Sequence, residues 1–260
     1  MASTRFRWNG SELVDRTDGF DVPVYAAVSF LLREGTVVDY PGHLARFARW
    51  ADEQGLKRPL DEFFDAVTEA LPRTGDYFPR IDLTSRGELE LHLRPVPPTS
   101  RTVIVSSAAT DPREEPTIKG PDFGVLHQLK DAAMAEGAQE AIILDAQGRL
   151  VDASTSCLVW LRENNLFTPP ADALRIQSIT VGIVEDLARE TGYSVETQWT
   201  TPAELEGAQL WILNALHGIR AVSSWVNGPT FTVNEALLDQ FRDRYEAQFV
   251  TVHFESSIDS

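Results

Sequence analysis

Cysteine and lysine are both scarce in this sequence, and each shortage restricts what the protein can do. The 260 residues include one cysteine, Cys157. A single cysteine excludes a disulfide within these residues, so we expect a protein of the reducing cytoplasm. The apolar residues that follow it, Leu158 to Trp160, predict a buried structural thiol rather than a nucleophile.

The sequence also lacks the motifs of several common functional sites. It contains no C-x-x-C, H-E-x-x-H, G-x-S-x-G or P-loop motif, so we expect no metal site, hydrolase chemistry or nucleotide binding. No apolar run reaches the roughly 18 residues of a membrane span. The first residues, M-A-S-T-R-F-R-W, lack the apolar core of a signal peptide, and we therefore expect no membrane association.

Acidic residues outnumber basic ones by 39 to 23, which gives a formal net charge of -16. Nucleic acids and anionic membranes require clustered positive charge on the protein, so neither is an expected partner. An anionic ligand must therefore be held by a local pocket.

The first part of the chain has the pattern of a small α+β domain, which we expect over residues 1–100. Residues 5–10, 22–32 and 36–38 are rich in strand-forming residues and predict an antiparallel meander with an Asn-Gly turn at its start. Helical spacing of apolar residues follows at 42–52 and 60–71, and two alternating strands at 80–83 and 88–93.

A proline-rich linker, Pro95 to Ser100, leads into a larger domain that we expect over residues 101–260. The same patterns predict strands at 103–106, 141–144, 150–152, 157–161, 209–214 and 221–226 in this part of the chain. They predict helices at 124–136, 180–192 and 234–249.

The scarcity of lysine leaves three candidates for amine chemistry: Lys57, Lys119 and Lys130. Lys57 lies in a polar connection, and Lys130 lies on the polar side of a predicted helix. Lys119 ends a short extended run before Gly120-Pro121, where the chain must turn, and this placement directs its side chain out of a strand end. A solvated surface lysine is the alternative interpretation.

Several motifs follow one another in a characteristic order. They are H-L-A-R-F at 43–47, K-G-P-D at 119–122, G-A-Q-E-A-I-I-L-D-A-Q-G at 137–148, V-D-A-S-T-S-C-L-V-W-L at 151–161, L-F-T-P-P at 166–170, S-I-T at 178–180 and W-I-L-N-A-L-H-G-I-R at 211–220. This order resembles the class IV aminotransferases. These are the fold-type IV pyridoxal-phosphate enzymes, and they include branched-chain and D-amino-acid aminotransferases and 4-amino-4-deoxychorismate lyase. The resemblance covers nearly the whole chain after about Trp8.

The resemblance implies a two-domain α+β fold with pyridoxal 5'-phosphate at the domain interface. It further implies a homodimer that acts on a small amino-acid-like substrate. N-A-L-H-G-I-R favours the lyase, which eliminates pyruvate to give 4-aminobenzoate. An aminotransferase of branched-chain or D-amino acids is the alternative.

The resemblance also assigns roles to individual residues. Lys119 is implied to form the Schiff base and then to move a proton as general acid and base. Asp152 stands where the family usually has a glutamate facing the pyridine nitrogen. The implied phosphate-binding groups are Arg46, the helix start Ser178, Ile179 and Thr180, and a second loop at Ala215 and Leu216, while His217 and Arg220 are implied to face the substrate carboxylate.

Each of these residues also has an interpretation that needs no cofactor. Arg46 fits a solvated helix residue, V-D-A-S fits a strand end with an Asx or Ser turn, S-I-T fits a helix cap and His217 fits a packed histidine. The chain also departs from the family pattern at Asp152, Val181 and Ala215, and Tyr25 to Phe30 replaces the family's F-E element. Because of these departures, a non-catalytic relative that serves as a binding protein is the alternative to an enzyme.

Overall fold

The computed structural model describes residues 3–16, 22–56 and 59–252, which divide into two compact units. The first unit takes its described residues from Met1–Pro98, Ile118–Pro121 and Gln248–Ser260, and the second consists of Thr99–Thr117 and Asp122–Ala247. The segment with Lys119 therefore belongs to the first unit, although its neighbours in the chain belong to the second. Lys57 lies outside the described residues.

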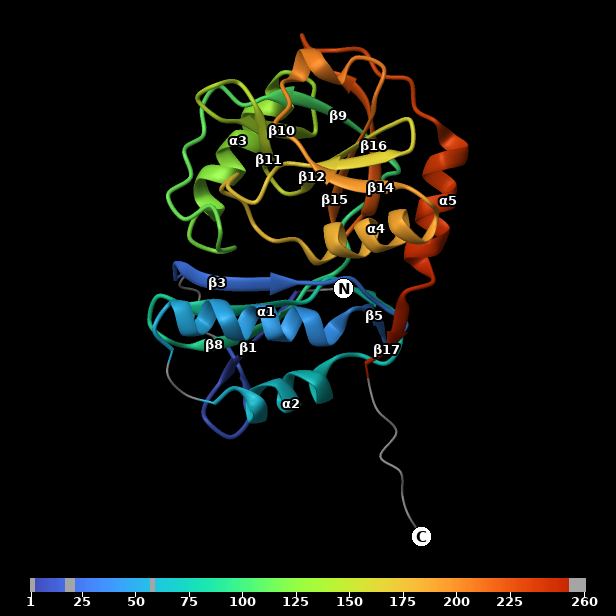
Figure 1. Cartoon of the computed structure of the whole chain (residues 1–260). Coiled ribbons are helices and arrows are strands. Elements are labelled where there is room, and N and C mark those ends of the chain that lie inside the picture. The colour runs from blue at the N-terminus through green and yellow to red at the C-terminus, as the bar shows by residue number, and fades with distance from the viewer. Residues whose placement is uncertain (1–2, 17–21, 57–58, 253–260) are drawn as a thin grey trace. The chain divides into compact units, whose positions relative to one another are not determined.

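The first unit contains a five-stranded antiparallel sheet with the strand order β2-β1-β8-β7-β3. Its strands are β1 (Thr4–Trp8), β2 (Leu13–Asp15), β3 (Val24–Ser29), β7 (Arg80–Thr84) and β8 (Leu89–Leu93). The alternation of strand residues places Ile81, Leu83 and Leu91 on one face, where they are buried. Helix α1 (Tyr40–Glu53) runs along β3 (Figure 1).

The remaining strands of this unit form a second sheet, and this corrects the predicted meander. Its order is β17-β5-β4-β6, from Phe249–Thr251, Thr36–Val38, Leu32–Arg33 and Asp76–Tyr77. β3 pairs with β7 instead of with the strand that follows it, because a break at Phe30-Leu31 sends the chain into the other sheet. The prediction of a last helix reaching Phe249 was also wrong, since α5 (Glu235–Glu246) ends earlier and Phe249 begins β17.

Helix α1 carries the H-L-A-R-F motif, and its start is fixed by a local cap. The Asp39 side chain accepts a hydrogen bond of 3.1 Å from the Gly42 N–H, and a proline occupies the first turn. His43, Phe47 and Trp50 recur at helical spacing and are buried. Helix α2 (Asp61–Ala70) adds Phe63 and Val67 to the same core.

The second unit is built on an eight-stranded mixed sheet with the order β11-β10-β9-β16-β15-β12-β13-β14. These strands are Leu150–Ala153, Glu140–Leu144, Thr102–Ser107, Gly218–Trp225, Gln209–Asn214, Cys157–Arg162, Asn165–Thr168 and Ser194–Thr197, respectively. The helices are α3 (Phe123–Ala135), α4 (Ile179–Glu190), α5 and the 3-10 turn η1 (Pro202–Leu205). The predicted α+β fold is confirmed.

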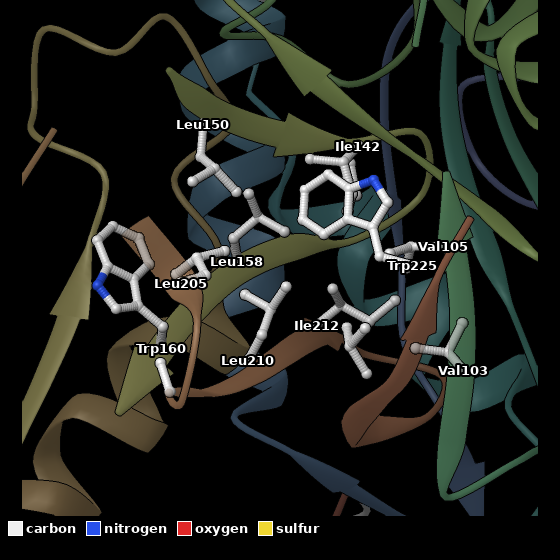
Figure 2. Packing of buried hydrophobic residues seen from close by; sticks show 13 residues of the cluster. Val103, Val105, Ile142, Leu150, Leu158, Trp160, Leu205, Leu210, Ile212 and Trp225 are labelled. Carbon is white, nitrogen blue, oxygen red and sulfur yellow. The ribbon is translucent and has the colours of Figure 1, made fainter. Parts of the chain in front are cut away.

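One face of this sheet carries a hydrophobic core. Its buried residues are Val103, Val105, Ile142, Leu150, Ala153, Leu158, Trp160, Leu205, Ala208, Leu210, Ile212, Val222 and Trp225. Figure 2 shows Leu158, Leu210 and Ile212 between the two tryptophans. Alternate apolar residues of the predicted strands therefore meet in this cluster. None of the helices in the described ranges is long and apolar enough to cross a membrane.

Candidate active site

Lys119 lies in a loop that packs against the edge strand β3 of the first unit. The loop is not the end of a strand, which corrects the sequence prediction. The Lys119 carbonyl accepts a hydrogen bond of 2.7 Å from the Ala27 N–H. Gly120 follows with φ 144°, and a Cβ atom there would lie 3.1 Å from both the Ala26 nitrogen and the Val24 oxygen. Glycine is therefore required next to Lys119, because a side chain would push the loop off the strand.

Two residues of helix α1 share the electrostatic surroundings of Lys119. His43 is buried, and its Nδ1 lies 3.5 Å from Arg46 Nη2. Burial, followed by the positive charges of Arg46 and Lys119, holds the pKa of His43 well below its ordinary value. His43 is therefore neutral at pH 7. The first unit brings together Lys119 and Arg46, which lie 73 positions apart in the sequence.

Arg46 is placed by a contact as well as by its helix. Its guanidinium lies over the ring of Trp50, 4.9 Å from the ring centroid. This stacking orients the side chain, and His43 and Trp50 flank it one turn away on either side. A planar, fixed guanidinium suits a phosphate group.

Asp152 is the residue before the last in strand β11 of the second unit and is almost fully buried, with 4% of its surface exposed. Its Oδ2 lies 3.5 Å from Arg113 Nη1, and the Cys157 thiol is held beside the carboxyl group. Among the described residues, Oδ1 has no hydrogen-bond partner. Burial raises the pKa of Asp152 to about 6, although the charges of Arg113 and Arg175 oppose this shift.

Cys157 is buried, as the sequence predicts. Burial, reinforced by the charge of Asp152, raises the pKa of its thiol above the ordinary range. The thiol is therefore protonated at neutral pH, which makes it a poor nucleophile.

The turn between Asp152 and Cys157 is organised by a buried carboxylate that sequence reasoning missed. Glu140 on β10 accepts hydrogen bonds from the hydroxyl groups of Ser154, at 2.6 Å, of Ser156, at 3.1 Å, and of Thr155. It also accepts a hydrogen bond of 2.8 Å from Arg220 Nη2 on β16. The S-T-S sequence between the two strands thus has a structural use.

This network changes the surroundings expected for Arg220. Its guanidinium is buried and also donates to Ser156 Oγ at 3.1 Å. One edge of the guanidinium is therefore held by Glu140, and the role of Arg220 toward a substrate stays a prediction.

The start of helix α4 offers donors for an anion. Ser178 is its N-cap and accepts a hydrogen bond of 3.3 Å from the Val181 N–H. The N–H groups of Ile179 and Thr180 lie in the first turn and meet no acceptor within the described part of the chain. Together with the helix dipole, these two groups form a favourable place for a phosphate.

The second predicted loop, between β15 and β16, has its donors already in use. The Asn214 Oδ1 accepts hydrogen bonds from the N–H groups of Leu216, at 3.1 Å, and His217, at 2.8 Å. Ala215 lies between them and has no hydroxyl group. The main-chain donors expected to bind phosphate at this loop are therefore partly engaged, and that role also stays a prediction.

His217 is half-buried, and its Nδ1 lies 3.4 Å from the Ser100 N–H, which donates to it. Burial, followed by the charge of Arg220, lowers the pKa of His217 to about 4. The histidine is therefore neutral at pH 7.

The K-G-P-D motif also anchors the Lys119 loop at its far end. Asp122 is buried, and its two carboxylate oxygens accept hydrogen bonds of 3.0 Å from the Glu114 and Glu115 N–H groups. Sequence reasoning did not single out Arg113, which lies in the same acidic loop. No periodic or motif signal marks that residue, because its partners come from distant parts of the chain.

Known proteins resemble this chain in both sequence and fold. The family described as Amino-transferase class IV matches residues 29–225. A stretch of 101 residues is 24% identical to the aminodeoxychorismate lyase of Vibrio harveyi. That match spans 38% of this chain and 37% of the relative, so this chain covers little more than a third of the relative's length.

Solved structures share the fold over almost the whole chain. A hypothetical aminotransferase from Mycobacterium tuberculosis in its PLP-bound form has a TM-score of 0.79 and 16% identity, with 97% of this chain and 100% of that chain covered. The branched-chain amino acid aminotransferase from Escherichia coli has a TM-score of 0.77 and 16% identity, with coverage of 98% and 97%. At these identities the likeness shows the fold alone.

Proposed function

This chain belongs to the class IV aminotransferase family, and we propose that it is a 4-amino-4-deoxychorismate lyase, which eliminates pyruvate from aminodeoxychorismate to give 4-aminobenzoate. The family and its solved relatives support a pyridoxal-phosphate-dependent enzyme. The similarity to the Vibrio harveyi lyase favours the lyase over an aminotransferase. The segment N-A-L-H-G-I-R at 214–220 favours it as well.

The structural observation that supports a pyridoxal-phosphate enzyme is the state of the Asp152 carboxyl group. It is buried, one oxygen faces Arg113 and the other has no partner among the described residues. A buried acceptor without a donor costs about 1–3 kcal/mol, so native proteins usually fill such a position. A protonated pyridine nitrogen is a donor of the required kind, and the residues present therefore fit the cofactor.

Groups for the cofactor's phosphate are present as well. The Ile179 and Thr180 N–H groups at the start of α4 supply main-chain donors, and Arg46 supplies a guanidinium held by Trp50. Val181, where the family has arginine, is buried and leaves the main-chain donors of that turn in place. We propose that the Ile179 and Thr180 N–H groups of the second unit bind the phosphate; a phosphate-binding role for Arg46 of the first unit rests on the family resemblance.

When bound, pyridoxal phosphate supplies an aldehyde that takes up an amine and a ring that accepts electrons. We propose that Lys119 provides that amine and then moves a proton at the substrate Cα as general acid and base. Its neighbours support this use. His43 is neutral, so it can accept a hydrogen bond without adding a third positive charge beside Lys119 and Arg46.

The decisive experiment follows pyruvate release from aminodeoxychorismate by the pyridoxal-phosphate-loaded protein, with no amino acceptor present. We expect pyruvate and 4-aminobenzoate in equal amounts. Lys119→Ala should abolish both products. Lys130→Ala is the matched control, because Lys130 is the other lysine that the structure describes, and it should leave the rate unchanged.

Amino transfer provides the contrasting outcome. If the loaded protein converts branched-chain amino acids with 2-oxoglutarate and releases no pyruvate from aminodeoxychorismate, the lyase proposal is wrong and the aminotransferase reading replaces it. Borohydride reduction of the loaded protein, followed by peptide mapping, should place the label on Lys119. Label on Lys57 or Lys130 would exclude the assigned amine.

A further inference from the structure

Arg113 lies beside Asp152 and has no role in the function proposed above. Its side chain is only 3% exposed. It donates to groups from three separate segments: Asp111 in its own loop, Asp152 on β11 and the Leu174 carbonyl between β13 and α4. A buried arginine with partners on three segments fixes their relative positions.

Asp111 determines the direction in which the guanidinium points. Arg113 Nε and Nη2 lie 2.8 Å from the two oxygens of the Asp111 carboxylate, which is the bidentate arrangement that fixes the guanidinium plane. Nη2 also donates to the Leu174 carbonyl at 3.1 Å. Nη1 is the nitrogen that remains, and it faces Asp152 Oδ2 at 3.5 Å.

We propose that Arg113 is a positioning residue that holds Oδ2 of Asp152 and so turns Oδ1 toward the donor that a ligand brings. The shorter reach of aspartate makes this orientation more important than it is for glutamate, which has one more methylene for adjustment. The inference rests on the proposed function, because it takes the pyridine nitrogen of pyridoxal phosphate as that donor.

The charged groups around Asp152 indicate how its pKa should change when the Arg113 guanidinium is removed. Arg113 and Arg175 face the carboxyl group, the Cys157 thiol lies beside it, and Asp111 and Asp122 act on Arg113. Both arginines oppose the rise in pKa caused by burial. Without Arg113, the carboxyl group should stay protonated to a higher pH and its orientation should no longer be fixed.

The test compares Arg113→Gln and Arg113→Lys with Asp111→Asn. Asp111→Asn keeps the charge of Arg113 but removes half of the bidentate anchor, so it separates position from charge. Arg189→Gln on α4 is the matched control, because within the described residues the ion pairs of Arg189 are with Glu185 and Asp186 of its own helix. The first readout uses the cofactor-free protein, and the second is the dissociation constant of pyridoxal phosphate.

In the cofactor-free protein, the melting temperature of each variant is compared with that of the same variant carrying Asp152→Asn as well. This difference in melting temperature should change with pH and become constant once the pH exceeds the pKa of Asp152. We expect Arg113→Gln to raise the pH at which this difference becomes constant by about one unit. We expect the dissociation constant of pyridoxal phosphate to rise about tenfold in Arg113→Gln. Asp111→Asn and Arg113→Lys should each raise it at least threefold, and Arg189→Gln should leave both readouts unchanged.

Unchanged readouts in all three variants would overturn the inference. A changed affinity in Arg113→Gln with none in Asp111→Asn would also overturn it, because charge alone would then explain the effect. If Arg113→Gln does not fold, Arg113→Lys and Asp111→Asn decide. If the unmodified protein binds no pyridoxal phosphate, the proposed function fails, and the pH shift alone decides whether Arg113 acts on Asp152.

Discussion

Arg220 and Glu140 form an ion pair of 2.8 Å in which 5% and 1% of the respective side chains are exposed. Although burial raises the pKa of Glu140, the charge of Arg220 and the hydrogen bond from Ser154 outweigh it and hold that pKa below its ordinary value. Glu140 is therefore ionised at pH 7. The pair fixes the turn between β11 and β12, which lies between Ala153, the neighbour of Asp152, and Cys157.

Replacing Glu140 with glutamine should lower the free energy of unfolding by about 3–5 kcal/mol, because the charge of Arg220 is left buried without its counter-ion. Urea denaturation at pH 7 measures this loss. The double variant Glu140→Gln/Arg220→Met removes both charges and should recover at least half of it. A loss below about 1 kcal/mol in the single variant would mean that the pair is dispensable.

Asp152→Asn should change how the stability of the cofactor-free protein depends on pH. Burial raises the folded-state pKa from 3.8 to about 6, so the folded protein binds more protons than the unfolded chain between these values. The contribution of Asp152 is therefore fully present below pH 4 and is lost as the pH rises through 6. The asparagine variant does not undergo this loss.

Above pH 7 the asparagine variant should consequently be more stable than the unmodified protein by up to about 3 kcal/mol, taking roughly 1.4 kcal/mol for each pKa unit. Thermal unfolding from pH 4 to pH 8 measures the difference. The same variant should bind pyridoxal phosphate more weakly, since a neutral amide does not favour a protonated ring nitrogen. An unchanged pH profile would contradict the buried state of Asp152.

Gly120→Ala should destabilise the first unit by about 1–3 kcal/mol, because the added Cβ meets backbone atoms of β3 and the φ of 144° disfavours alanine. Gly124→Ala is the matched control. Gly124 lies in α3, with nothing within 4 Å of an added Cβ, so alanine should be neutral or stabilising there. Denaturant unfolding compares the two, and borohydride labelling of Lys119 should decline only in Gly120→Ala.

His217 should titrate far below the ordinary range of histidine. Its folded-state pKa of about 4 compares with 6.5 for a free histidine, so the folded protein binds fewer protons than the unfolded chain between these values. This group therefore makes stability rise with pH from about 4 to about 6.5, opposite to Asp152. An NMR titration of the imidazole should give a midpoint near 4, and a midpoint above 6 would show that the ring is solvated and uncoupled from Arg220.

The sequence by itself determined many of the helices and strands and the family pattern. Apolar residues at period two or at helical spacing report which face of a segment is buried, and that is a local property. The strands around Ile142 and Ile212 and the helix with Phe47 were predictable for this reason. The K-G-P step at 119–121 likewise predicted a turn and singled out one lysine among three.

Only the tertiary structure decided which segments meet. Phe249 reads as the end of a helix but forms a strand beside β5, and Lys119 leaves its neighbours in the chain to pack on β3. The partners of Asp152 and Arg220 likewise lie 39 and 80 positions away. The position of a charged residue in the sequence does not indicate which distant residue it pairs with. Whether the pair is buried depends on how the whole sheet assembles. For that reason Asp152 and Arg220 could be predicted as site residues from the family resemblance of the sequence, whereas Arg113 and Glu140 were identified only in the folded structure.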